Sequence, residues 1–126
     1  MVTVKGASET IKRAVLEWAG VECKPHRFGG LEFSLGAREI GHVHGDSLVD
    51  IPFPTAVRHE IVAAGEAEPH HILPRTGWVS LYLREEADVG RAIALLERSY
   101  RIATQQRANR KSTGKPTDPG NSALRD

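Results

Sequence analysis

Residues 40–54 read IGHVHGDSLVDIPFP, and this stretch decides how the rest of the chain is interpreted. It places two histidines two residues apart, breaks at a Gly-Asp pair, and continues as an apolar run that carries Asp50. Side chains alternate between the two faces of a strand, so the pattern predicts two neighbouring strands joined by a tight turn. The second strand covers residues 48–53. Pro52 and Pro54 place it at an edge of the sheet, because proline cannot donate a ladder hydrogen bond.

The residues before this stretch predict its pairing partner. Residues 31–35 (LEFSL) alternate apolar and polar side chains, which is typical of a half-buried strand. A Gly-Ala pair follows and fits a two-residue hairpin turn. With such a turn Phe33 faces Ile40, and His42 and His44 share the face of these two residues.

The remaining chain shows helical and strand patterns in turn. Apolar residues recur at spacings of three and four in three segments. Ser8 and Thr55 are suitable N-caps, and glycine follows the first two segments. We expect helices over about 8–19, 55–65 and 85–108. We expect further strands at 21–25, as an edge strand, and at 78–83.

These elements predict an α+β fold in a single domain. An antiparallel sheet of four to five strands carries three helices, packed mainly on one face. Residues 8–109 form this domain, after a flexible arm over residues 1–7. The composition changes to Lys, Ser, Thr, Gly and Pro near the end of the chain, so residues 110–126 are expected to be a disordered tail.

Composition and charge limit the functions that the chain can have. Its 126 residues suit one domain, and a net charge of +1 produces no strong field that would attract nucleic acid. The single cysteine cannot form an internal disulfide. We find no apolar segment of a secretory signal and none that could span a membrane, so we expect a cytoplasmic protein.

The histidines are the candidate chemistry. Two imidazoles from one strand face suit a metal site, which His70, His71, Asp46 or Asp50 would complete. The alternative is that the histidines bond with backbone groups or carboxylates and fix loop geometry. No HExxH or CxxC motif is present, so metal and cofactor stay open. His59 lies on the second predicted helix and should be solvated.

Several blocks together resemble a known family. They are HRFGG (26–30), REIGHVHGDSLVDIPFP (38–54), EPHHILPRTGWVSLYL (68–83) and LLERSY (95–100). Over residues 10–103 the chain resembles the luciferase-domain family of small bacterial proteins of uncharacterised function. This resemblance supplies no catalytic residues. GWVSLYL and LLERSY also resemble the end of the MmcQ/YjbR-like proteins, which have a compact α+β fold and are suspected of binding DNA.

Two functions follow as hypotheses. The first is a small ligand-binding or enzyme-like domain, and the second is a nucleic-acid or protein interaction module without catalysis. The first requires converging histidines, whereas the second requires an exposed basic or aromatic face. Whether the site catalyses a reaction is left open, as is the oligomeric state. The predicted ligand-binding residues are His26, Arg27, His42, His44, Asp50, His70, His71 and Trp78.

Overall fold

Six strands form one antiparallel sheet in the computed structural model, which describes residues 2–26 and 29–113. The strand order is β1-β2-β3-β4-β6-β5. The strands are β1 (Val21–His26), β2 (Gly30–Leu35), β3 (Arg38–His44), β4 (Leu48–Pro52), β5 (Glu68–Pro69) and β6 (Trp78–Tyr82). The α+β class is confirmed. The sheet has one strand more than expected, because the short β5 pairs with β6.

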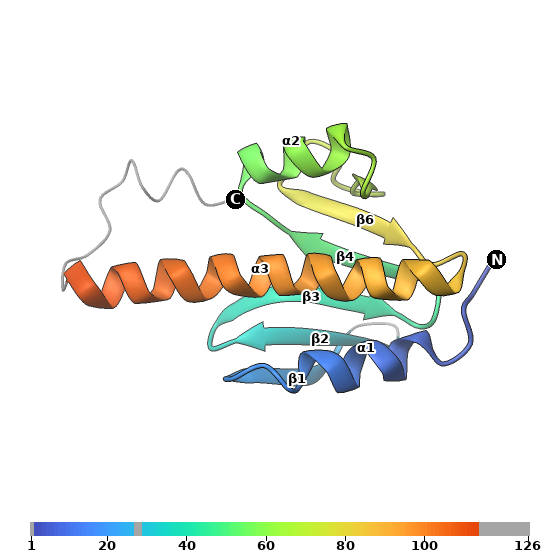
Figure 1. Ribbon diagram of the computed structural model, residues 1–126, viewed down its shortest axis with the longest axis horizontal. Helices are drawn as coiled ribbons and strands as arrows, with labels where there is room; N and C mark the ends of the chain where they lie inside the picture. The colour runs from blue at the N-terminus through green and yellow to red at the C-terminus, as the bar shows by residue number, and fades with distance from the viewer. Residues whose placement is uncertain (1, 27–28, 114–126) are drawn as a thin grey trace.

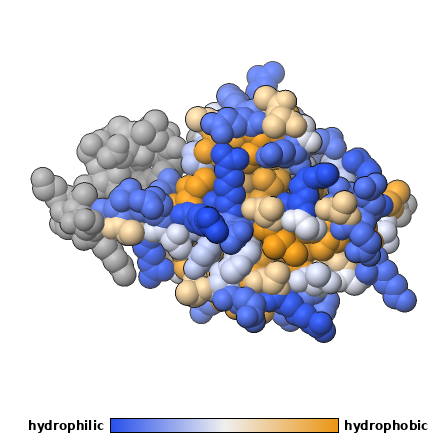
Figure 2. Space-filling view, in the orientation of Figure 1, coloured by the Kyte–Doolittle hydropathy of each residue, from blue (hydrophilic) through white to orange (hydrophobic). Residues whose placement is uncertain are grey.

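Three helices accompany the sheet, namely α1 (Ala7–Val15), α2 (Thr55–Ala63) and α3 (Glu86–Thr113). Figure 1 shows α3 across the front of the sheet, with α1 below it and α2 above it. Figure 2, drawn in the same orientation, shows hydrophobic residues visible between polar residues on this side of the molecule. None of the helices in the described part of the chain is long and apolar enough to cross a membrane. We call the sheet surface under α3 the helix face and the opposite surface the distal face.

The core lies between the sheet and the helices. Leu96 of α3 is fully buried, as its place in the apolar stripe predicts. A Cβ atom on Gly41 would collide with the Leu96 side chain, and the φ angle of Gly41 is 154°. Glycine at this position therefore lets α3 approach β3 closely.

A bulge corrects the predicted pairing of β2 and β3. The residues next to the turn pair as predicted, but the register shifts between Phe33 and Ser34. Beyond the shift, Glu32 faces His42. His42 therefore lies on the face of Glu32, and the prediction that it shares the face of Phe33 and Ile40 is wrong. An extra residue in one strand reverses the alternation of side chains, which is the physical reason.

The predicted edge position of β4 is also wrong, since β4 lies between β3 and β6. β3 pairs with residues 48–50 of β4, so Pro52 lies beyond that ladder. Pro52 pairs with Trp78 on the other side. A proline at the end of a strand is compatible with a central position, because its missing N–H interrupts no bond to β3.

Asp46 determines where α1 begins. The helix starts at Ala7 with Gly6 as N-cap, in place of the predicted cap Ser8. The Asp46 carboxylate accepts the backbone N–H groups of Ser8 at 2.8 Å and Gly6 at 3.2 Å. The carboxylate thus satisfies N–H groups that a helix start leaves unpaired, from a position far along the chain. The helix ends at Val15, earlier than expected.

Other boundaries differ from the predictions as well. Val4 is buried and its N–H donates to the Asp46 carbonyl at 3.0 Å, and Ala7, the last residue of the predicted arm, is the first residue of α1. Pro54 is the N-cap of α2, and Thr55 is the first helical residue. α3 continues to Thr113, into the predicted tail, whose remaining residues lie outside the described part of the chain.

Candidate functional site

Asp50 lies at the centre of the distal face. Val49 and Ile51, its neighbours in β4, are fully buried in the core, so Asp50 points to the other side of the sheet. Its side chain is only 1% exposed. Ser80 lies opposite on β6 and donates a hydrogen bond from Oγ to Asp50 Oδ1 at 2.7 Å. A buried carboxylate is costly unless it is hydrogen-bonded, so the neighbours of Asp50 are essential to it.

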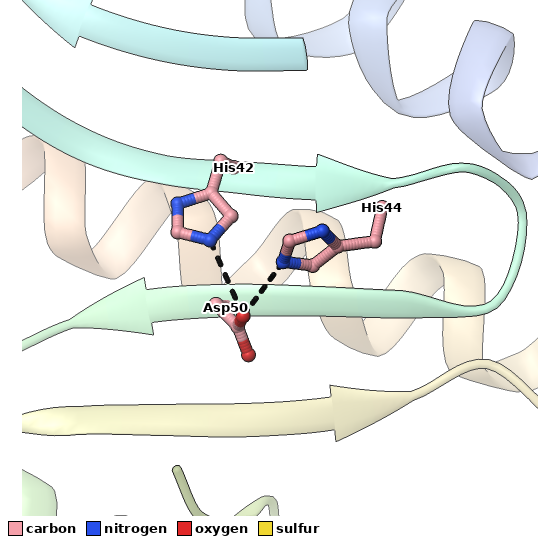
Figure 3. Close-up of side chains that lie close together, drawn as sticks. All are labelled: His42, His44 and Asp50. Carbon is pink, nitrogen blue, oxygen red and sulfur yellow. Dashed lines mark hydrogen bonds and ion pairs between the residues drawn. The ribbon is translucent and has the colours of Figure 1, made fainter. Parts of the chain in front are cut away.

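Two histidines of β3 approach the same carboxylate. The Nε2 atoms of His42 and His44 lie 3.2 Å and 2.9 Å from Asp50 Oδ2. Figure 3 shows both rings directed from β3 toward Asp50, with the helices on the far side of the strands. The two histidines therefore share one face of β3, which is the distal face.

The segment after β5 brings two more histidines to Asp50. The backbone N–H of His71 donates to Ser80 Oγ at 3.1 Å, which holds this segment against β6. The Nε2 atoms of His71 and His70 lie 3.0 Å and 3.3 Å from Asp50 Oδ2. We call His42, His44, His70 and His71 the histidine cluster.

Two further aromatic rings border this cluster. His26, at the end of β1, stacks on His42 with ring centroids 4.2 Å apart. The Trp78 ring lies 5.2 Å from that of His42. Arg27 lies outside the described residues, and His59 is exposed on α2, as expected. All the predicted site residues that the structure describes therefore lie together.

Sequence reasoning missed two residues that bond with the site. Glu39 Oε2 lies 2.6 Å from His42 Nδ1, and Ser80 bonds with Asp50. Strict alternation would put Glu39 and His42 on opposite faces, and only the bulge brings them together. Ser80 lies two residues from Trp78 in β6, so the two side chains share one face of this strand. The signal that would have identified it is the pairing of β4 with β6, which the sequence does not specify.

Burial and the neighbouring carboxylates oppose each other in the electrostatics of the site. Burial acts to lower the pKa of His42, but hydrogen bonds to Asp50 and Glu39, together with the attraction of their charges, outweigh it and raise this pKa to about 9. Burial acts to raise the pKa of Asp50, but the bonds from His42 and its other neighbours hold it well below its usual range. Burial lowers the pKa of His70. The site thus favours a charged His42–Asp50 pair beside a neutral His70.

The donor set suits proton exchange or metal binding. The ligand atoms of His42, His44 and Asp50 lie within 4.8 Å of one another, as do those of Asp50, His70 and His71. Imidazole and carboxylate groups exchange protons and are common metal ligands. A cavity of about 230 Å³ has a different lining, made by Val2, Ser47, Leu48, Tyr82, Leu83 and Arg84. Converging side chains, and not this cavity, therefore define the candidate site.

Comparison with known proteins yields one family. A family model described as "Luciferase domain" matches residues 37–99, half of the 126-residue chain. The match runs from the turn before β3 into α3 and contains the whole histidine cluster with Asp50, whereas His26 lies before it. No curated protein and no solved structure matches the chain. The resemblance to MmcQ/YjbR-like proteins receives no support from this match.

Proposed function

The chain belongs to the luciferase domain family, and we propose that it is a small ligand-binding domain whose ligand is held by the histidine cluster. One observation carries this proposal. Four imidazole Nε2 atoms approach a single buried carboxylate oxygen, Asp50 Oδ2, at 2.9–3.3 Å. This is the convergence of polar groups that a ligand-binding site requires.

The fold does not need this cluster for its core. Apolar side chains of the strands and helices fill the helix face. Ordering four histidines around one carboxylate removes side-chain freedom and water from ionisable groups, both of which oppose folding. Groups with shifted pKa values that converge in this way are concentrated at functional sites.

The cluster can be reached from solvent. The side chains of His44 and His71 are each 29% exposed, whereas that of Asp50 is 1% exposed. A ligand would therefore meet the two outer imidazoles first and Asp50 at the bottom of the site. Imidazoles donate and accept protons near neutral pH, so the same groups suit acid–base chemistry on a bound ligand.

The alternative interaction module receives less support. An interaction module requires an extended basic or aromatic surface, whereas the histidines converge on one atom. The net charge of +1 also favours no polyanionic partner. The proposal includes a cytoplasmic location, and this part of it rests on the sequence.

Native mass spectrometry of the full chain, purified without a tag, tests the proposal. We expect the wild-type protein to carry an additional mass that denaturation removes. The variant His44→Ala should lose this mass, and the control His59→Ala should keep it, because His59 is exposed on α2. A wild-type protein without any bound mass, or a His44→Ala protein that retains it, would contradict the proposal.

A further inference from the structure

The four Nε2 atoms are more hydrogen-bond donors than one carboxylate oxygen can accept. Their distances from Asp50 Oδ2 are 2.9 Å for His44, 3.0 Å for His71, 3.2 Å for His42 and 3.3 Å for His70. A carboxylate oxygen offers about two lone-pair sites, so two N–H donors saturate it. The other imidazole nitrogens then have no hydrogen-bonding role toward Oδ2. A cation shared by nitrogen lone pairs and Oδ2 resolves this crowding.

His70 is the histidine that acts as a donor. Its Nδ1 accepts the backbone N–H groups of Ile72 at 3.1 Å and Leu73 at 3.0 Å. A nitrogen that accepts hydrogen bonds carries the lone pair, so the proton of the neutral ring is on Nε2. His70 Nε2–H lies 3.3 Å from Asp50 Oδ2, at ion-pair distance, and this nitrogen has no lone pair for a cation. This makes His70 a positioning residue.

The neighbours of His42 leave its Nε2 available. Glu39 Oε2 lies 2.6 Å from His42 Nδ1, so Nδ1–H donates to Glu39. In the metal-free protein Nε2 holds a proton toward Asp50, and an ion that displaces this proton binds the lone pair that it leaves on Nε2. This carboxylate–histidine arrangement is the usual support of a histidine that binds metal. Ser80 donates to Asp50 Oδ1, which leaves Oδ2 as the oxygen directed at the histidines.

We propose that Nε2 of His42 and His44, together with Oδ2 of Asp50, bind one divalent transition-metal ion of the zinc type. This inference rests on the proposed ligand-binding function and names the class of ligand. Zinc–nitrogen bonds are about 2.0–2.1 Å long, so the ligand atoms of a tetrahedral site lie roughly 3.3 Å apart. The two nitrogens lie 3.2 Å and 2.9 Å from Oδ2, close to that separation, and the three ligand atoms lie within 4.8 Å of one another. His71 Nε2 lies 3.0 Å from Oδ2 but is not within 4.8 Å of the other two nitrogens, so it is not a member of this ligand set.

The donor types restrict the choice of ion. Two imidazole nitrogens and one carboxylate oxygen suit zinc, cobalt or nickel, whereas magnesium and calcium prefer oxygen ligands throughout. The partly exposed rings of His44 and His71 provide the path by which an ion enters. The competing explanation is a hydrogen-bonded network that supports the fold and binds no ion.

Calorimetric titration separates the two explanations. The full-length, untagged protein is treated with a chelator, dialysed, and titrated with ZnCl₂. We expect saturable binding of one ion per chain and a rise in melting temperature with zinc. Titration with CoCl₂ should produce the visible absorption of tetrahedral cobalt. Absence of saturable binding of both ions by the folded wild-type protein would overturn the inference.

Variants test the assignment of ligands. His42→Ala and His44→Ala should each weaken zinc binding by more than about 100-fold, whereas His70→Ala should weaken it by about 10- to 100-fold and keep the stoichiometry, as loss of an outer-shell partner does. His59→Ala is the matched control and should bind like the wild type. Circular dichroism shows that each variant is folded. Loss of binding in His70→Ala with retention in His44→Ala would overturn the assignment.

The same experiments separate this inference from the proposed function. A bound mass other than that of a metal ion, together with no zinc or cobalt binding, would overturn the metal site and leave ligand binding standing. Absence of every bound mass and of metal binding would overturn both.

Discussion

The two faces of the central sheet are formed by the same strands, but one face is packed with apolar side chains and the other carries polar and ionisable ones. The helix face is packed with fully buried apolar side chains, among them Phe33, Val43, Val49, Ile51 and Val79. The distal face presents His42, Asp50 and Ser80 from the intervening positions. Because successive residues of a strand point to opposite faces, each strand supplies stability with one set of residues and the candidate site with the other.

The two faces also treat charge differently. Cys23 lies opposite Phe33 and packs against the core, and burial there raises the pKa of its thiol. Burial alone therefore disfavours a charged group on the helix face. On the distal face, hydrogen bonds override burial, because His42 has a raised pKa and Asp50 a lowered one. The lesson is that the polarity of the neighbours, more than depth, decides which face can hold charge.

Among the changes that test this comparison, removal of Asp50 should have the largest effect on the free energy of unfolding. In the metal-free protein, Asp50→Ala should lower the free energy of unfolding by roughly 3–5 kcal/mol, because it leaves the buried charge of His42 unpaired. Denaturant unfolding measures the loss. The control is Glu60→Ala, which removes a carboxylate that is 66% exposed and ion-paired with Arg98. It should cost about 0–1 kcal/mol. Equal losses in the two variants would show that Asp50 is not an organising group.

On the helix face, Leu96→Ala should lower the free energy of unfolding by roughly 2–5 kcal/mol, because it opens a cavity between α3 and the sheet. The matched control is Leu16→Ala, since Leu16 is 41% exposed. It should change stability by less than about 0.5 kcal/mol. A loss of that small size for Leu96→Ala in the same unfolding experiment would mean that α3 packs through another stripe.

Two buried serines provide a finer test. Ser80→Ala should cost about 1–3 kcal/mol, because Asp50 loses a donor and the N–H of His71 loses its acceptor. Ser34 is buried as well, yet its Oγ has no hydrogen-bond partner among the described residues. Ser34→Ala should therefore be nearly neutral when both variants are unfolded side by side. The opposite ranking would show that the distal network adds no stability.

The smallest expected effect concerns Cys23. A raised pKa leaves less thiolate at pH 8, and the thiolate is the form that reacts with iodoacetamide. The folded protein should be alkylated more slowly than the same chain in denaturant, and its rate should rise as the pH increases. Mass spectrometry follows the modification. Faster alkylation of the folded protein would contradict the view that the helix face disfavours charge.

Much of the architecture could be predicted because its signals are local. The alternating residues of β6 and the apolar stripe of α3 mark which side of each element is buried, and the burial of Leu81 and Leu96 confirms this. The errors in strand pairing arose where the neighbour or register of a strand depends on a segment distant in the sequence. The alternation of 31–35 contains no sign of the bulge after Phe33, and Pro52 suggested an edge although β6 lies beside it.

The sequence by itself determined the fold class, the approximate elements and the residue types that gather near Asp50, because periodicity and turn chemistry are properties of short segments. Only the tertiary structure decided that four histidines share one carboxylate oxygen, that Glu39 orients His42, and that Ser80 holds Asp50 across 30 residues of chain. These contacts depend on strand order and on one bulge. Both are set by packing between distant segments, which no local pattern of residues records.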